Sequence, residues 1–122
     1  MLTLAVALAG GLGAVARFTV DGVVRSRQPG PVPWGTLLIN LTGSFLLGVL
    51  TGAVLFGGEP TALTVVASTG FCGGYTTFST ASFEIVRLVQ QRRYRTVALV
   101  AAVNLLGCPA AAAASLALAS GL

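Results

Sequence analysis

The chain has 122 residues, of which 55% are hydrophobic and only 8% are charged, whereas a soluble domain carries about 25% charged residues. Together with a mean hydropathy of +0.91, this composition excludes an ordinary soluble domain and predicts an all-α membrane protein. The formal net charge is +4; because the arginines lie mainly in short loops, they indicate membrane anchoring and orientation and not a nucleic-acid partner.

Four membrane-spanning helices are predicted in a single domain that covers residues 1–122. The beginning of the chain could be mistaken for a signal peptide, but it lacks a basic leading segment, and we interpret it as the first span. A proline-rich segment at residues 28–33 cannot be helical and separates the first two spans. The helices are expected at about residues 2–24, 34–56, 61–93 and 96–119.

The third span contains a segment of glycines and hydroxyl residues, residues 70–80, at the centre of an uncharged run. Paired glycines favour an interruption, which we expect near residues 73–77, in the middle of the membrane. Backbone groups released by such a break must be buried in protein or line a polar cavity. The broken third helix is therefore the predicted functional site.

Arginine placement predicts one fixed orientation. The side of the membrane that carries Glu59 has no arginine or lysine, whereas the two loops on the other side carry six arginines. By the positive-inside rule the arginine-bearing loops are cytoplasmic and both termini lie outside a plasma or inner membrane. These six residues are Arg25, Arg27, Arg87, Arg92, Arg93 and Arg95.

No catalytic constellation is visible in the sequence. There is no histidine, and the acidic residues Asp21, Glu59 and Glu84 all lie away from the middle of a span. A proton-coupled carrier normally needs a titratable group there. The sequence therefore disfavours an enzyme, a side-chain metal site and a proton-coupled carrier.

Neutral hydrogen-bond donors occupy the spans instead. Asn40 lies in mid-helix, and it is either an interhelical hydrogen-bonding group or a pore-lining donor, two interpretations that can both hold. Donors without negative side chains suit an anion, and the ring of Phe78 adds a positive edge. Arg17 either attracts anions or extends to the headgroups. The further hydroxyl candidates for an anion path are Thr36, Ser44, Ser79 and Thr80.

Three motifs carry a family resemblance: Gly10-Gly-Leu-Gly-Ala-Val-Ala-Arg17, Gly35-Thr-Leu-Leu-Ile-Asn40-Leu-Thr-Gly43, and Gly70-Phe-Cys-Gly-Gly-Tyr-Thr-Thr-Phe-Ser-Thr80 followed by Glu84. In this order and spacing they resemble the CrcB/Fluc fluoride channels. The resemblance implies a passive, fluoride-selective channel that lowers intracellular fluoride and its toxicity.

The resemblance also implies an antiparallel dimer with two pores and a structural, untransported sodium ion at its centre. Backbone carbonyls of Gly74 and Thr77 would bind the sodium. Asn40 would be the pore amide, Phe78 the first pore phenylalanine, and Arg17 the basic residue of the vestibule.

Two of the departures from the family pattern bear on the pores and on the assembly. Ala81 stands where a second pore phenylalanine is usual, and Phe83 is no simple substitute because it lies about 140° further around the helix. Many family members have nearly balanced loop charges and insert in both orientations, so the strong arginine bias of this chain is unusual. It predicts that the chain pairs with a paralogue of opposite orientation and not with itself.

Two other functions remain open from the sequence. A small four-helix multidrug transporter is also an antiparallel dimer, but it needs a carboxylate in its first span, and residues 1–16 contain none. A non-conducting membrane scaffold would use the glycines and hydroxyls only to pack its helices.

Overall fold

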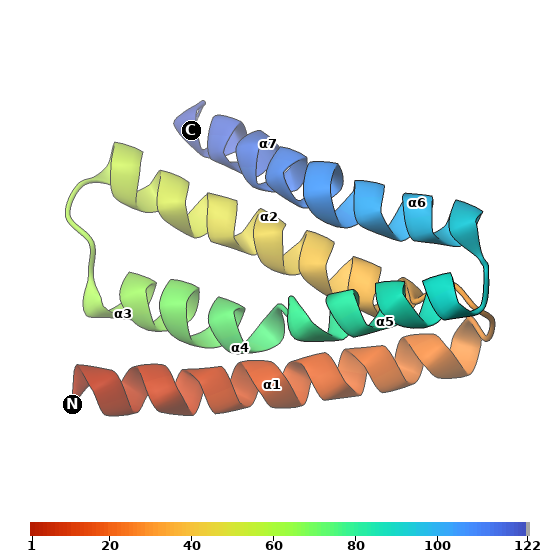
Figure 1. Ribbon diagram of the computed structural model, residues 1–122. Coiled ribbons are helices and arrows are strands. Elements are labelled where there is room, and N and C mark those ends of the chain that lie inside the picture. The colour runs from red at the N-terminus through yellow and green to blue at the C-terminus, as the bar shows by residue number, and fades with distance from the viewer. Residues whose placement is uncertain (122) are drawn as a thin grey trace.

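The computed structural model describes residues 1–121, which form four antiparallel helical runs (Figure 1). Among these residues, three helices are long and apolar enough to cross a membrane: Leu2–Arg27, Trp34–Gly57 and the continuous run Tyr94–Ser120. The first two are α1 and α2. The prediction of an all-helical, multi-pass membrane protein is therefore confirmed.

The third run is divided into several pieces. It begins with α3 (Ala62–Val65), continues through the π-helical segment η1 (Val66–Cys72) and α4 (Gly73–Tyr75), and resumes as α5 (Ser79–Gln90). Thr61 and Thr64 cap its start by exchanging hydrogen bonds between each side chain and the other's backbone N–H. Residues 76–78, where Thr76 is extended, separate α4 from α5.

The fourth run also changes from α-helical to π-helical and back to α-helical along its length. It consists of α6 (Tyr94–Ala102), the π-helical segment η2 (Val103–Gly107) and α7 (Cys108–Ser120). Pro109 lies in the first turn of α7. Because proline has no N–H and its ring crowds the carbonyl of the preceding turn, regular α-helical bonding is lost just before it.

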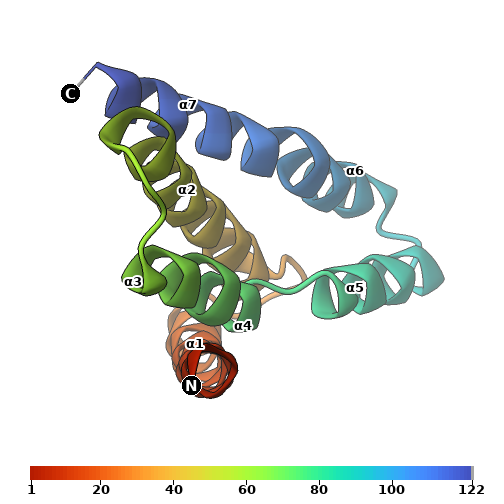
Figure 2. The same cartoon turned by 90° about the vertical axis from the view of Figure 1, so that its left-hand side faces the viewer.

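Different loops of the chain lie at the two ends of the molecule. Both termini and the loop at residues 58–61 lie at one end, whereas the loops at residues 28–33 and 91–93 lie at the other (Figure 1). Viewed along the helices, α2 lies between the pair α1 and α4 and the run α6–α7, while α5 diverges toward α6 (Figure 2). Residues of α2, α5 and α6 line a common pocket.

Glycines let α1 approach the third run very closely. A Cβ at Gly74 would overlap the backbone of Gly10, and one at Gly13 would overlap the carbonyl of Phe71. Gly70 packs against Ala9 in the same way. Backbones that come this close exclude larger side chains, so the glycines fix the position of the break relative to α1.

Small residues recur every four positions in α2 and in α7, and these two rows pack against each other. Gly48 of α2 lies against Ser115 and the carbonyl of Ala112, both on α7. One turn further, Gly52 meets Ala119. This contact holds α7 against α2, whereas α6 packs against α5 and contributes Ala101 to the pocket.

Several helix ends differ from the predicted positions by two or three residues. α1 continues to Arg27 because nothing blocks the helix before Pro29. α5 ends at Gln90, three residues early, because Arg92 turns to a positive φ of 59°. α6 begins at Tyr94, two residues earlier than expected.

Candidate functional site

A pocket of about 690 Å³ opens beside the break, between α2, the third run and the α6–η2 segment. Among the described residues that line it, none is charged. Its polar groups are amides and hydroxyls, contributed by Asn40, Ser44, Ser68, Thr69, Thr76, Thr77, Ser82 and Asn104. The lining is mainly apolar, and these groups add neutral hydrogen-bonding capacity without a charged side chain.

Asn40 is joined to both backbone polar groups of Thr77. Its Nδ2 donates to the carbonyl of Thr77 at 3.0 Å, and its Oδ1 accepts from the N–H of Thr77, also at 3.0 Å. The amide thus replaces the backbone partner that a continuous helix would have provided. Asn40 is 7% exposed, so these bonds offset the cost of burying an amide.

Asn104 completes this network from the fourth run. Its Oδ1 accepts the second Nδ2 hydrogen bond of Asn40 at 2.9 Å, and its own Nδ2 donates to the carbonyl of Val100. Both N–H groups of Asn40 are therefore engaged, whereas Asn104 keeps one N–H unassigned. The sequence prediction omitted Asn104. Two signals were available: Asn104, like Asn40, is an amide inside a predicted span, and Asn-Leu-Leu-Gly at residues 104–107 resembles Asn-Leu-Thr-Gly at residues 40–43.

The break presents two chemically opposite ends. Because Thr76 is extended, the carbonyls at the end of α4, including that of Gly74, lose their usual i+4 donors. The first N–H groups of α5 face the same interruption from the other side. One of them, from Thr80, donates to the hydroxyl of Thr77 at 3.2 Å. Carbonyl oxygens suit a cation, and N–H groups suit an anion.

The other predicted path residues do not all line the same pocket. Ser44 and Phe78 line the pocket with Asn40, and Phe78 is 85% exposed at its rim. Ala81 also lines this pocket. Thr36 and Ser79 are not part of its lining, and Thr80 lines a second pocket further along α5.

Arg17 lies on α1 one turn after Gly13, on the face that packs against α4. Its Nε is buried and, within residues 1–121, has no hydrogen-bond partner. It is not part of the lining of either pocket described here. A buried guanidinium N–H without an acceptor can accommodate an anionic or polar group.

Comparison with known proteins matches residues 4–116 to the family described as CrcB-like protein, Camphor Resistance (CrcB). The chain belongs to this family. Among curated relatives of this CrcB-like chain, "Fluoride-specific ion channel FluC 1" of Leifsonia xyli subsp. xyli is 59% identical over 99 residues, which cover 81% of this chain and 72% of the relative. The family assignment does not support the multidrug-transporter alternative.

Two further relatives of the CrcB-like chain come from one organism, Geobacillus kaustophilus. "Fluoride-specific ion channel FluC 2" is 44% identical over 110 residues, covering 88% of this chain and 84% of the relative. "Fluoride-specific ion channel FluC 1" is 44% identical over 103 residues, covering 84% of each chain. That organism therefore has two separate relatives.

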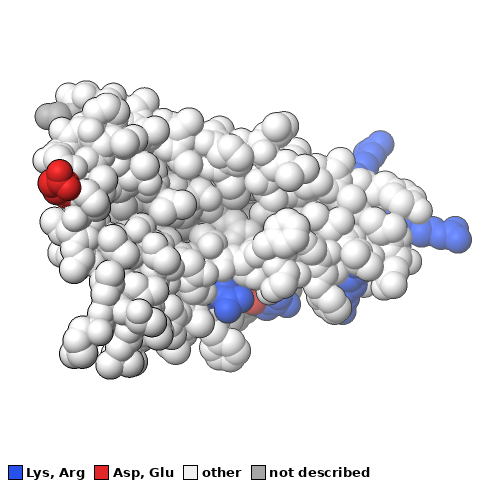
Figure 3. Space-filling model, turned by 60° about the vertical axis from the view of Figure 1, so that its left-hand side comes forward, with Lys and Arg blue, Asp and Glu red and all other residues white. Residues whose placement is uncertain are grey.

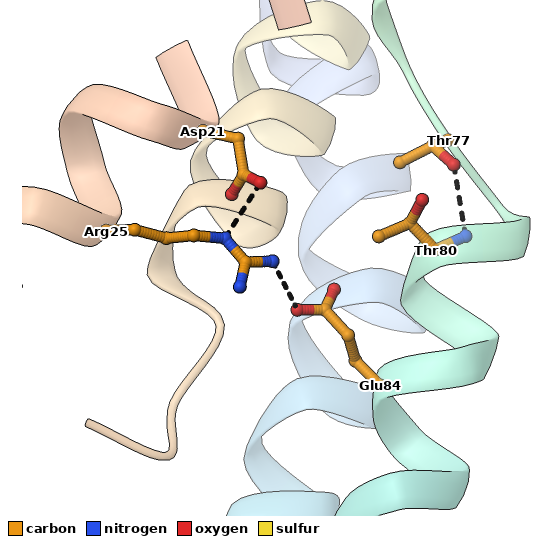
Figure 4. Close-up of polar contacts among 5 residues, drawn as sticks. All are labelled: Asp21, Arg25, Thr77, Thr80 and Glu84. Carbon is orange, nitrogen blue, oxygen red and sulfur yellow. Dashed lines mark hydrogen bonds and ion pairs between the residues drawn. The ribbon is translucent and has the colours of Figure 1, made fainter. Parts of the chain in front are cut away.

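A second pocket, of about 860 Å³, lies at the arginine-rich end of the CrcB-like chain. Figure 3 shows blue arginine side chains gathered at this end and an acidic side chain at the opposite end, where the 58–61 loop contains Glu59. The pocket is lined by Thr80, Glu84 and Arg87 of α5 and by Arg25 of α1. Arg25 lies between two carboxylates, Asp21 and Glu84 (Figure 4).

Proposed function

We propose that this chain is a subunit of a fluoride-selective channel through which fluoride leaves the cell passively. The observation that carries the proposal is the uncharged pocket beside the break, whose hydrogen-bonding side chains are amides and hydroxyls together with two cysteine thiols. Sequence similarity also supports the proposal, because the relatives named above are called fluoride-specific ion channels.

The chemistry of the pocket suits a small, strongly hydrated anion. Removing water from fluoride requires many well-placed donors, and a larger halide fits a narrow, donor-rich path less well. The N-terminal end of α5, the hydroxyls of Ser44 and Thr77 and the free N–H of Asn104 are such donors. Phe78 adds a ring edge at the rim. Asn40 orients this set, since it fixes the backbone of Thr77.

We further propose that the break lies at membrane depth and holds a structural sodium ion on the carbonyls of Gly74 and Thr77. The donor set fits such an ion: Gly74 has lost its helical donor, and the Thr77 carbonyl, which accepts one bond from Asn40, retains a second lone pair. When bound, sodium would offset the partial negative charge of these carbonyl oxygens. Two carbonyls from one chain are few for a hard cation, so a second subunit would supply more.

The proposed assembly is an antiparallel dimer in the plasma or inner membrane. The arginine-rich end would face the cytoplasm, and the termini would lie outside. Because this bias fixes one orientation, the partner is a paralogue that inserts the other way up. The occurrence of two numbered relatives in one organism supports a paired system. Because Ala81 stands where a second pore phenylalanine is usual, one of the two pores would lack its second aromatic ring.

Reconstitution tests the function directly. Liposomes loaded with potassium fluoride would contain the chain alone, a second four-span chain of opposite arginine bias alone, or both. We expect rapid fluoride efflux only from the mixture, and little chloride efflux from an otherwise identical preparation. Full activity of this chain alone would exclude the required heterodimer, and no efflux from any preparation would favour a scaffold.

A further inference from the structure

One face of α5 connects the break to the arginine-rich end of the molecule. Thr77 lies in the break, and Thr80, Glu84 and Arg87 follow it at intervals of three or four residues, which places these three on one side of α5. All three line the second pocket. If the proposed anion path holds, an ion that moves between the break and this end must pass Glu84.

A carboxylate at this position opposes anion passage. The side chain of Glu84 is only 13% exposed, so water screens its charge poorly. Its Oε1 is buried and has no hydrogen-bond partner within residues 1–121. An anion path along α5 therefore requires that the charge of Glu84 be compensated by a neighbouring group.

Arg25 supplies that compensation from another helix. Its Nη2 lies 3.6 Å from Oε2 of Glu84, and its Nε donates to Oδ2 of Asp21 at 2.8 Å. Asp21 thereby fixes the direction of the guanidinium, one turn earlier on α1. Arg87 on α5 and Thr36 on α2 also face the Glu84 carboxyl, but within residues 1–121 Arg25 alone forms an ion pair with it.

The close approach of α1 and α2 holds this arrangement in place. A Cβ at Gly35 would overlap the carboxylate of Asp21, so glycine at the start of α2 is what allows Asp21 to sit beside Arg25. Three helices thus contribute to the position of one guanidinium.

We propose that Arg25 is the counter-ion of Glu84, a positioning residue that makes this end of the path passable to anions. The inference rests on the proposed fluoride-channel function. It assigns to Arg25 a role that its five cytoplasmic-side neighbours in the arginine-rich loops do not share, because only Arg25 is paired with Glu84 among the described residues.

The test compares Arg25→Gln with Arg27→Gln in the assembly that conducts with the wild-type chain. Both variants remove one positive charge from the last turn of α1, but Arg27 lies outside the pocket lining and the ion pairs. An unscreened carboxylate close to the path should reduce fluoride efflux about tenfold or more in R25Q. R27Q should remain within about twofold of wild type.

A second substitution separates the charge effect from a structural effect. The double variant R25Q/E84Q lacks the bridge between α1 and α5 but also lacks the uncompensated charge, so we expect its flux to return to within about threefold of R27Q. A merely structural bridge would not be restored in this way. Thermal unfolding in detergent checks that each protein is folded.

Three outcomes would overturn the proposal: R25Q conducting like R27Q, a folded double variant as slow as R25Q, or a folded Arg25→Lys variant, which retains the charge, as slow as R25Q. If R25Q does not assemble, Arg25→Lys is measured in its place. Fluoride efflux through Arg25→Lys close to that through R27Q then supports the counter-ion role. Absence of flux in the wild-type assembly would instead contradict the channel function itself.

Discussion

The side-chain amide of Asn40 is bonded to both the N–H and the carbonyl of Thr77, at 3.0 Å each. Thr77 lies between α4 and α5, where the backbone has left its helical bonding pattern. One side chain of α2 therefore fixes the local geometry at the break. Asn40 therefore stabilises the backbone at the break and is also a member of the proposed anion path.

Replacing Asn40 with leucine should affect both conduction and stability. The variant would leave the two backbone groups of Thr77 and the Oδ1 of Asn104 without their partner, which costs about 3 kcal/mol in free energy of unfolding. We expect fluoride efflux to be abolished and the thermal unfolding midpoint in detergent to fall. A Thr19→Val control removes an exposed hydroxyl that, among the described residues, bonds only to the carbonyl of Val15 in its own helix, and it should change both quantities little. Normal efflux from N40L would argue for the scaffold alternative.

A methyl group at Gly13 should prevent close packing of α1 on the third run. Gly13→Ala would place a Cβ against the carbonyl of Phe71 and the N–H of Tyr75, and backbone atoms cannot move aside cheaply. We expect a loss of about 3 kcal/mol or more, seen as a low yield of folded protein or a lowered unfolding midpoint.

Gly11→Ala is the matched control for this prediction. Gly11 lies two residues earlier on the same helix, and a Cβ added there would meet no neighbouring atom within 4 Å. Its replacement should change stability by no more than about 1 kcal/mol. Equal effects of G11A and G13A would show that helix propensity, and not contact with the third run, governs the result.

The sequence predicted those parts of the fold that depend on composition. Long apolar runs predicted the helices, whereas the contact of Gly48 with Ser115 was seen only in the structure. Helix ends were less accurate where they depend on one backbone angle. The positive φ of Arg92 shortens α5, and nothing in an arginine predicts that angle.

The site was predictable as a set of residue types but not as a network. Asn40 was singled out because an amide inside a membrane span needs a partner. Which partner it has depends on how three separate runs meet, so neither its two bonds to Thr77 nor the contribution of Asn104 followed from spacing. The separation of Thr36 and Thr80 from the first pocket likewise depends on where α5 diverges from α2.

Sodium should stabilise the assembled channel if carbonyls at the break bind it. Replacing sodium with N-methylglucamine, an organic cation too large for a carbonyl site, should lower the unfolding midpoint of the dimer in detergent, and returning sodium should restore it with a saturable dependence. Potassium at the same ionic strength is the control for screening. An unfolding midpoint that is identical in all three salts would contradict a bound sodium ion.

The end of α5 offers a stabilising substitution. The N–H of Arg92 donates to the carbonyl of Val89, and that of Arg93 donates to the carbonyl of Leu88, which is the paired pattern of a Schellman helix end. Its left-handed position, with φ of 59°, is occupied by Arg92, although glycine is the residue that adopts it without strain. Arg92→Gly should therefore raise the free energy of unfolding by about 1 kcal/mol.

Arg93→Gly removes the same charge at the next position, where φ is −92° and glycine relieves no strain. It should therefore leave the unfolding midpoint unchanged or slightly lower. Neither residue belongs to the proposed ion pairs, so a rise confined to R92G would identify backbone strain at the helix end as the cause. Equal rises in both variants would instead attribute the effect to relief of repulsion among the clustered arginines at residues 92, 93 and 95.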